Sequence, residues 1–179
     1  MAQARTRPKP LPPQARQPPR PASQPASQPP LPRAGALAMS AVKGKVLGAA
    51  GLKNVDLWGK SDPFVKVTLE KGGDAVGEMK TSTKTDDLNP TWDDEPFNFA
   101  CDDDDFMDYS LRFRILDTGL GPDVELGEAL VPLKLIPLLD GDADAAVFTF
   151  SLGVNSGKKK SLGTITIAAK VVPKPGLFG

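Results

Sequence analysis

Two aspartates in one short loop are the first residues of this chain whose types and spacing could do chemistry. Asp56 and Asp62 lie six positions apart in the segment 52–65, which reads LKNVDLWGKSDPFV. The segment contains several turn-forming residues and lies between two strand-like runs. Carboxylates that converge in an irregular loop suit a hard cation, because Ca²⁺ takes about six to eight oxygen ligands in a flexible geometry.

An apolar pair, Leu57 and Trp58, lies between these two aspartates and is followed by Gly59. An apolar loop tip suits an oily partner such as a membrane, because an indole has an apolar body and an N–H that can stay in water. The alternative is that Trp58 packs back against its own loop. The sequence alone leaves both arrangements open.

Composition argues against catalysis. The chain has no histidine, which removes the commonest general base and the usual zinc ligand. Its single cysteine, Cys101, has no histidine partner to activate it, excludes an internal disulfide framework and fits a reducing compartment. We therefore expect a binding protein and not an enzyme.

The formal net charge of zero hides a division of charge along the chain. Residues 1–40 carry six basic side chains and no acidic one, so the remainder has a net charge of −6. This balance gives no sign of nucleic-acid binding. No apolar run approaches the roughly 20 residues that a transmembrane helix needs, and the start of the chain lacks the apolar region of a secretory signal. We expect a cytoplasmic protein.

Residues 1–40 are predicted to be a disordered tail rich in proline and arginine. Eleven of the 19 prolines fall between Pro8 and Pro32. Such a segment cannot bury enough apolar surface to offset its ordering entropy. Arg7, Pro10 and Pro13 have the spacing of an SH3-domain ligand. A chance match in a proline-dense segment is the alternative.

From residue 41 onward the apolar residues alternate with polar ones, which is typical of half-buried strands. Turn signals such as Gly72-Gly73 separate the runs. Only a short stretch, Lys134 to Leu139, has a helical character. The pattern predicts an all-β fold, an eight-stranded antiparallel β-sandwich. The strands are expected at 42–49, 64–70, 78–84, 91–100, 110–115, 126–132, 147–152 and 164–171.

The motifs of this region resemble those of the C2 domain family, in order along the chain. The segment 52–65 matches the family's first loop and the strand after it. Residues 80–99, with Lys80-Thr81 and the run LNPTW, match the middle of the domain, and residues 111–133 match the strands around its third loop. The order resembles the type II arrangement of phospholipase C-like and small plant C2 proteins. The resemblance assigns residues 41–172 to a C2 domain and 173–179 to a C-terminal tail.

The resemblance implies a Ca²⁺ site built from loops one and three. Asp56 and Asp62 fall on the ligand positions of loop one, and Asp117 falls on the first ligand position of loop three. Gly119 stands where the family has a bridging acid. The last acidic position corresponds to either Asp123 or Glu125, because loop three is one residue short. These residues imply one ion, with a second bound weakly; the alternative is a domain that does not bind Ca²⁺ at all.

The resemblance also implies contacts with lipid. Two apolar residues of loop three, Leu120 and Val124, would share a rim with the tip of loop one. Three lysines fall on the strands where many relatives carry a basic groove for phosphoinositides: Lys66, Lys80 and Lys84. Surface lysines that are merely solvated are the alternative, since Ser82 replaces a further lysine.

Two functions follow as hypotheses. The first is a monomeric domain that binds anionic phospholipid membranes in response to Ca²⁺, and so becomes a peripheral membrane protein. The second is a Ca²⁺-independent interaction or adaptor module that binds a protein or a phosphoinositide, with the segment Arg7 to Pro13 recruiting SH3-like domains.

Overall fold

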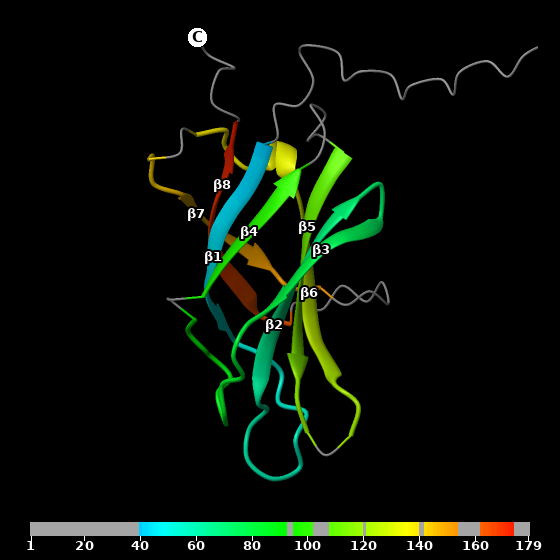
Figure 1. The fold of residues 1–179 in the computed structure, drawn as a ribbon. Coiled ribbons are helices and arrows are strands. Elements are labelled where there is room, and N and C mark those ends of the chain that lie inside the picture. Colours follow the sequence, from blue (N-terminus) through cyan, green and yellow to red (C-terminus); the bar gives the residue numbers. More distant parts are fainter. Residues whose placement is uncertain are drawn as a thin grey trace, which may run out of the picture. The chain divides into compact units, whose positions relative to one another are not determined.

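The computed structural model describes residues 40–92, 95–101, 108–119, 121–139, 142–153 and 162–173 of the chain. Within these residues eight strands form two four-stranded antiparallel sheets (Figure 1). The predicted all-β antiparallel sandwich is confirmed. The predicted SH3 ligand and the C-terminal residues 174–179 lie outside the described residues, so their assignment stays a prediction.

The strands follow one another with short connections. Their bounds are β1 Ser40–Ala50, β2 Pro63–Lys71, β3 Asp74–Lys80, β4 Pro96–Cys101, β5 Tyr109–Asp117, β6 Val124–Pro132, β7 Ala146–Ser151 and β8 Thr164–Val172. The first sheet has the order β4-β1-β8-β7 and the second has the order β3-β2-β5-β6. The last strand, β8, pairs with the first, β1, and the chain then enters the second sheet at β2. This is the strand order that the sequence predicted.

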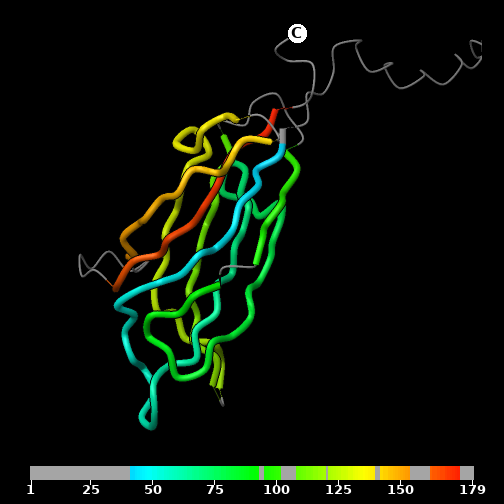
Figure 2. The backbone as a smooth tube through the Cα atoms, turned by 90° about the vertical axis from the view of Figure 1, so that its left-hand side faces the viewer, coloured from blue at the N-terminus to red at the C-terminus, as the bar shows by residue number. Residues whose placement is uncertain are grey.

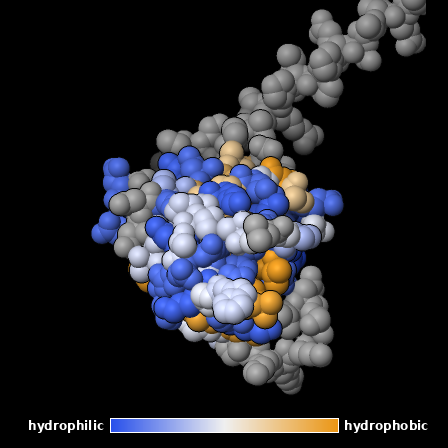
Figure 3. All heavy atoms as spheres, turned by 90° about the horizontal axis from the view of Figure 1, so that it is seen from below, coloured by the Kyte–Doolittle hydropathy of each residue, from blue (hydrophilic) through white to orange (hydrophobic). Residues whose placement is uncertain are grey.

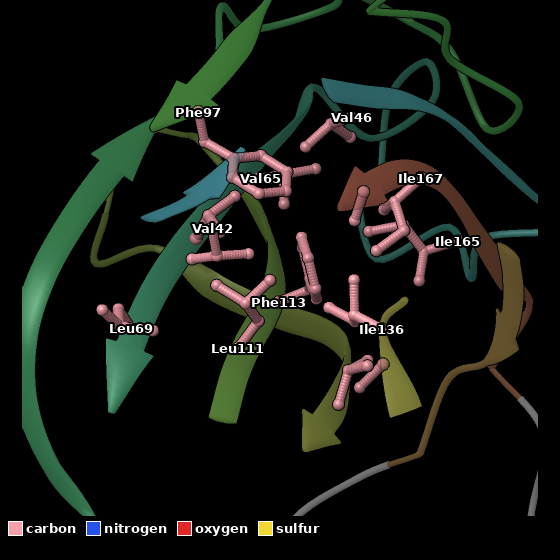
Figure 4. Packing of buried hydrophobic residues seen from close by; sticks show 14 of the residues in the cluster. Val42, Val46, Val65, Leu69, Phe97, Leu111, Phe113, Ile136, Ile165 and Ile167 are labelled. Carbon is pink, nitrogen blue, oxygen red and sulfur yellow. The ribbon is translucent and has the colours of Figure 1, made fainter. Parts of the chain in front are cut away.

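The core lies between the two sheets. β8 shows strict alternation, with Ile165, Ile167, Ala169 and Val171 each fully buried. From the facing sheet come Val65 and Phe113, also fully buried (Figure 4). Fully burying a side chain of this size contributes about 1.5–3 kcal/mol, so the core is the main source of stability.

Two local expectations are corrected. The strand expected at 78–84 ends at Lys80, because the Thr81 side chain takes over the pairing: its hydroxyl accepts from the N–H of Val65 at 2.8 Å. The helical stretch expected from Lys134 to Leu139 is a single 3₁₀ turn, η2, at Leu133–Leu135.

The turn ends because Ile136 precedes Pro137. A residue before proline is forced away from the helical region, and Ile136 has φ −96° and ψ 130°. The chain after the proline instead bridges to β8 through Leu138 and Val171.

Three loops meet at one end of the sandwich, the lower end in Figures 1 and 2. Loop one (51–62) joins β1 to β2, loop two (81–95) joins β3 to β4, and loop three (118–123) joins β5 to β6. Because β1 and β5 end where β2 and β6 begin, the antiparallel arrangement itself brings residues far apart in the sequence to this end. We call it the loop end.

Candidate metal and lipid site at the loop end

Side chains within loop one fix its shape. Asn54 donates from Nδ2 to the carbonyl oxygen of Gly59 at 2.9 Å and accepts at Oδ1 from the N–H of Asp56 at 3.2 Å. The buried hydroxyl of Ser61 accepts from the N–H of Val55 at 3.0 Å. Gly59 has φ 86°, in the left-handed region that favours glycine. Loop one is therefore a closed structure that holds its tip in one place.

The tip of loop one is exposed. Leu57 is 94% exposed and Trp58 is 93% exposed, so Trp58 does not pack back against its own loop. Figure 3 looks onto the loop end and shows apolar residues (orange) lying among hydrophilic ones (blue). Val124, at the edge of loop three, is also exposed, at 47%. The predicted partner Leu120 lies outside the described residues.

Asp86 of loop two joins loop one, a role that the sequence analysis missed. Its Oδ1 accepts from the N–H of Lys60 at 2.8 Å, and its own N–H donates to Oδ1 of Asp62 at 2.8 Å. Asp86 has φ 54°, a left-handed conformation that aspartate and asparagine tolerate better than most residues. An acidic residue two positions before the LNP turn of loop two was the available signal.

Asp117, the last residue of β5, is the buried acid of the site. Its side chain is only 3% exposed, and its Oδ1 accepts from the N–H of Asp62 at 2.6 Å. A second hydrogen bond runs in the opposite direction, from the N–H of Thr118 to the carbonyl oxygen of Asp62 at 3.2 Å. Loops one and three are thus joined by two hydrogen bonds at the point where the resemblance placed the metal ligands.

Burial raises the pKa of the Asp117 carboxyl, because the charged form loses its hydration. The hydrogen bond from Asp62 lowers this pKa in part. The negative charges of Asp56, Asp62 and Asp123 then raise it further, in that order of size. The four predicted aspartates therefore share one electrostatic environment, with Asp117 at its buried centre.

Glu125 is placed elsewhere. Its Oε2 lies 3.0 Å from Nη2 of Arg114, on the outer face of the second sheet. A shift in strand register between Ile115 and Leu116 inserts one extra residue, Leu126, into β6. Asp123 and Glu125 lie two residues apart and face the same side of the strand, so their position along it separates them. Glu125 lies opposite Leu116 and pairs with Arg114, whereas Asp123 lies next to Val124, the partner of Asp117, and acts on Asp117.

Gly119 leaves room for the missing acid. A Cβ added at this position would meet no atom within 4 Å, and the same is true of Gly121 on the same loop. Within the described part of the chain, no three acidic groups come close enough together to hold a metal ion by themselves. The residues present supply some of the ligands for an ion, and the remainder would have to come from water or lipid.

The ammonium groups of two of the three predicted lysines contact neighbouring side chains. Lys66 pairs with Glu78 at 2.7 Å, and the ammonium group of Lys80 lies 3.5 Å from the centre of the Phe64 ring. The main-chain N–H of Lys84 donates to the carbonyl oxygen of Pro63, and its ammonium group forms no ion pair with another described residue. Two arginines on the same face, Arg112 and Arg114, are paired with the glutamates of neighbouring strands: Glu70, Glu125 and Glu128. This face of the second sheet is close to neutral.

Comparison with known proteins identifies the fold family. The model of the family described as "C2 domain" matches residues 40–150, which is more than half of the chain. The chain belongs to the C2 domain family. C2 domains are a family of lipid- and Ca²⁺-binding modules, so the resemblance found in the sequence is confirmed at this level.

Several known proteins are similar to this C2 domain. Human synaptotagmin-5 is 38% identical over 87 residues, which are 48% of this chain and 22% of that protein. A protein of Arabidopsis thaliana named calcium-dependent lipid-binding protein is 33% identical over 100 residues, which are 56% of this chain and 17% of that protein. The chain thus spans less than a quarter of the length of these curated relatives.

Solved structures agree with the family. The C2A domain of plant extended synaptotagmin 1 matches with a TM-score of 0.63 and 31% identity, covering 75% of this chain and 95% of that one. A C2 domain-containing protein from a putative elicitor-responsive gene matches with a TM-score of 0.56 and 20% identity, covering 79% and 94%, which supports the fold alone. None of the helices among the described residues has the length and apolar character needed to cross a membrane.

Proposed function

We propose that this C2 domain binds anionic phospholipid membranes in response to Ca²⁺, through its loop end, with one ion as the main switch. The observation that carries the proposal is the shared environment of the four aspartates beside an exposed apolar tip. Asp56, Asp62 and Asp123 all raise the pKa of the buried Asp117, so these carboxylates repel one another when no cation is present.

The ligand types fit Ca²⁺, which prefers carboxylate and carbonyl oxygens. The proposed ligands are Asp56, Asp62, Asp117 and Asp123, which the ion would have to draw closer together than they lie in the described structure. Bound Ca²⁺ would supply positive charge between these carboxylates and the phosphates of the lipid. Glu125, the other acid suggested by the sequence, is already paired with Arg114 and is not part of the proposal. Gly119 supplies no side-chain ligand, so we propose weak binding until lipid completes the coordination.

The apolar tip supports membrane contact. Leu57 and Trp58 are almost fully exposed, and a soluble protein gains nothing from such a pair unless another surface covers it. Burying either side chain in a membrane interface contributes about 1.5–3 kcal/mol. The similarity to the Arabidopsis protein named calcium-dependent lipid-binding protein supports the same function.

The lysines of β2 and β3 are a minor part of the proposal. A lysine near an anionic surface contributes about 1 kcal/mol only when its charge is available. Lys66 is paired with Glu78, and four glutamates of this face offset its four basic groups. We therefore propose general attraction to anionic lipid at the loop end over a dedicated phosphoinositide groove.

The test is co-sedimentation of the full chain with vesicles of phosphatidylserine and phosphatidylcholine, in Ca²⁺ and in a chelator. We expect pelleting that depends on Ca²⁺ and is lost in Asp62→Asn. A matched control is Asp74→Asn, which removes an exposed acid from the first residue of β3, at the opposite end of β2 from loop one. Equal pelleting with and without Ca²⁺, or none in either, would contradict the proposal.

A second candidate is favoured by the hydrogen bonds between the loops. Asp62, Asp86 and Asp117 are all satisfied by main-chain N–H groups, so the loop end keeps its shape without an ion. A Ca²⁺-independent adaptor would need only a loop end that keeps its shape without an ion. Vesicle binding that persists in chelator, or capture of an SH3 domain that is lost on Arg7→Ala, would favour it.

A further inference from the structure

A groove on the outer face of the first sheet belongs to none of the sites above. It has a volume of about 620 Å³ and lies over β4, β1 and β8, the face turned toward the viewer in Figure 2. One side is formed by lysines 43 and 45 of β1, and the other by residues 142–145, just before β7. Its floor is apolar, with Pro96 and Ala168 among its residues.

The register of the strands gathers three lysines in this groove. Lys43 and Lys45 point outward because they alternate with the buried Val42 and Val46. Lys43 lies directly opposite Lys170 across the β1–β8 pair. Like charges opposite one another on a sheet are destabilising, so the pairing of Lys43 with Lys170 lowers the stability of the folded protein. Neither Lys43 nor Lys45 forms an ion pair with another described residue.

The other wall carries acceptors. Lys170 donates from Nζ to the carbonyl oxygen of Ala143, which ties the segment 142–145 to the sheet. Asp142 and Asp144 of this segment are exposed and line the groove. The groove therefore offers cations from β1 and β8, carboxylates from the segment 142–145, and small apolar residues of β4 and β8 on either side of Lys45.

We propose that this groove binds an acidic peptide segment of a partner protein. Its carboxylates meet the lysines, its main-chain N–H groups meet Asp142 and Asp144, and an apolar side chain covers Pro96 and Ala168. A bare phosphate is a poorer fit, because it would lie close to two carboxylates and leave the apolar floor uncovered.

Other polyanions fit less well. Lys43 lies seven residues before the end of β1, roughly 23 Å along the strand from loop one. A membrane docked at the loop end is therefore beyond the screening length of about 8 Å at physiological salt. A nucleic acid is repelled by the net charge of −6 on residues 41–179, and the chain's own N-terminal segment is basic and does not complement the lysines.

The first test is a titration of the ¹⁵N-labelled full chain, in chelator and without vesicles, with a short peptide of alternating glutamate and leucine. We expect amide shifts at residues 43–45, 97–98 and 168–170. The matched peptide has glutamine in place of glutamate and is expected to leave these amides unmoved. Inorganic phosphate is the third arm. Equal shifts with phosphate, or no shift with the acidic peptide, would overturn the proposal.

Variants of the groove distinguish the contribution of its charges to peptide binding from the contribution of its shape. The double variant Lys43→Gln/Lys45→Gln should weaken peptide binding about tenfold, and its control Lys53→Gln/Lys134→Gln, at exposed lysines outside the groove, should not. Ala168→Leu fills the floor and should also weaken binding while every charge remains. Equal weakening in the control pair would show general charge attraction and refute a built site. These readouts do not involve Ca²⁺ or lipid, so they are independent of the proposed membrane function.

Discussion

The main-chain N–H of Asp62 donates to Oδ1 of Asp117 at 2.6 Å, which joins two residues that lie 55 positions apart. The bond links loop one to the end of β5 at the place where the C2 family binds Ca²⁺. Each of these residues carries a carboxylate, so the same contact that closes the loop end also brings two negative charges together. Stability and ion binding therefore oppose one another at this pair.

Replacing Asp117 with asparagine should stabilise the Ca²⁺-free protein and abolish its Ca²⁺ response. The raised pKa means that ionised Asp117 is unfavourable in the folded state, whereas an amide oxygen can still accept from Asp62. Relieving a charge of this kind commonly contributes about 0.5–2 kcal/mol. Thermal unfolding in chelator measures the first effect and vesicle co-sedimentation the second. A lower melting temperature would contradict the interpretation.

The same residue gives a pH dependence with a definite sign. Because the pKa of Asp117 is higher in the folded state than in the unfolded chain, the folded chain binds more protons in the window just above the ordinary aspartate value of 3.8. The contribution of Asp117 to stability therefore falls as pH rises through that window. Melting temperatures of the wild type and Asp117→Asn, compared across this range, should diverge as the pH increases. Parallel curves would show that Asp117 does not titrate in this way.

Restoring an acid in loop three should strengthen Ca²⁺ binding. Gly119→Asp has room for its side chain and supplies the position that the C2 family normally fills with a carboxylate. Ligand charge count sets Ca²⁺ affinity, so we expect vesicle binding at about tenfold lower Ca²⁺. Gly121→Asp adds the same charge to the same loop with equal room and is the matched control. An equal gain in both variants would point to general electrostatics.

Asp86 should act as a positioning residue for loop one. Asp86→Ala removes the acceptor for the N–H of Lys60, while Asp86→Asn keeps both an acceptor and a tolerance for φ 54°. Hydrogen exchange should therefore speed up at the amide of Lys60 in the alanine variant and remain slow in the asparagine variant. Ca²⁺-dependent vesicle binding should likewise be weaker in the alanine variant and be retained in the asparagine variant. Unchanged exchange in Asp86→Ala would exclude this role.

Trp58 should enter the membrane interface. Only two tryptophans are present, and Trp92 is buried, with its Nε1 donating to Ser82, so a lipid quencher reports on Trp58 alone. Brominated lipid should quench the wild-type fluorescence on Ca²⁺ addition and leave Trp58→Ala unaffected. The alanine variant should bind vesicles about tenfold more weakly, and Trp58→Phe should retain most of the affinity. Unchanged affinity in Trp58→Ala would mean that the tip stays in water.

Some features of the site are local and were predictable from the sequence. Loop one carries its ligand types, its glycine and its apolar pair within a few residues, whereas the exposure of Leu57 and Trp58, which the sequence left open, was decided by the structure. Other features depend on partners distant in the sequence. Asp86 belongs to a turn of loop two, and the LNP turn after it marks it as a loop residue without naming its partners, Lys60 and Asp62.

The choice between Asp123 and Glu125 shows why features that depend on distant partners could not be predicted from the sequence. Both are acids at similar spacing from Asp117, and they lie two residues apart, on the same side of the strand. The pairing of β5 with β6 places Glu125 opposite Leu116 and within reach of Arg114, and places Val124 opposite Asp117, so Asp123 is the acid beside Asp117. In the same way Lys66 looks available in the sequence, but the β2–β3 pairing places Glu78 within 2.7 Å of it.

The sequence by itself determined the alternation of apolar residues, the two-sheet sandwich and the family, because these depend on short-range periodicity and on motifs within continuous segments. The tertiary structure decided which charges meet, because strand register and loop contacts set distances between residues far apart in the chain. It brought three aspartates near the buried carboxyl of Asp117, paired Lys66 of β2 with Glu78 of β3, and left Lys43 and Lys45 of β1 lining a groove.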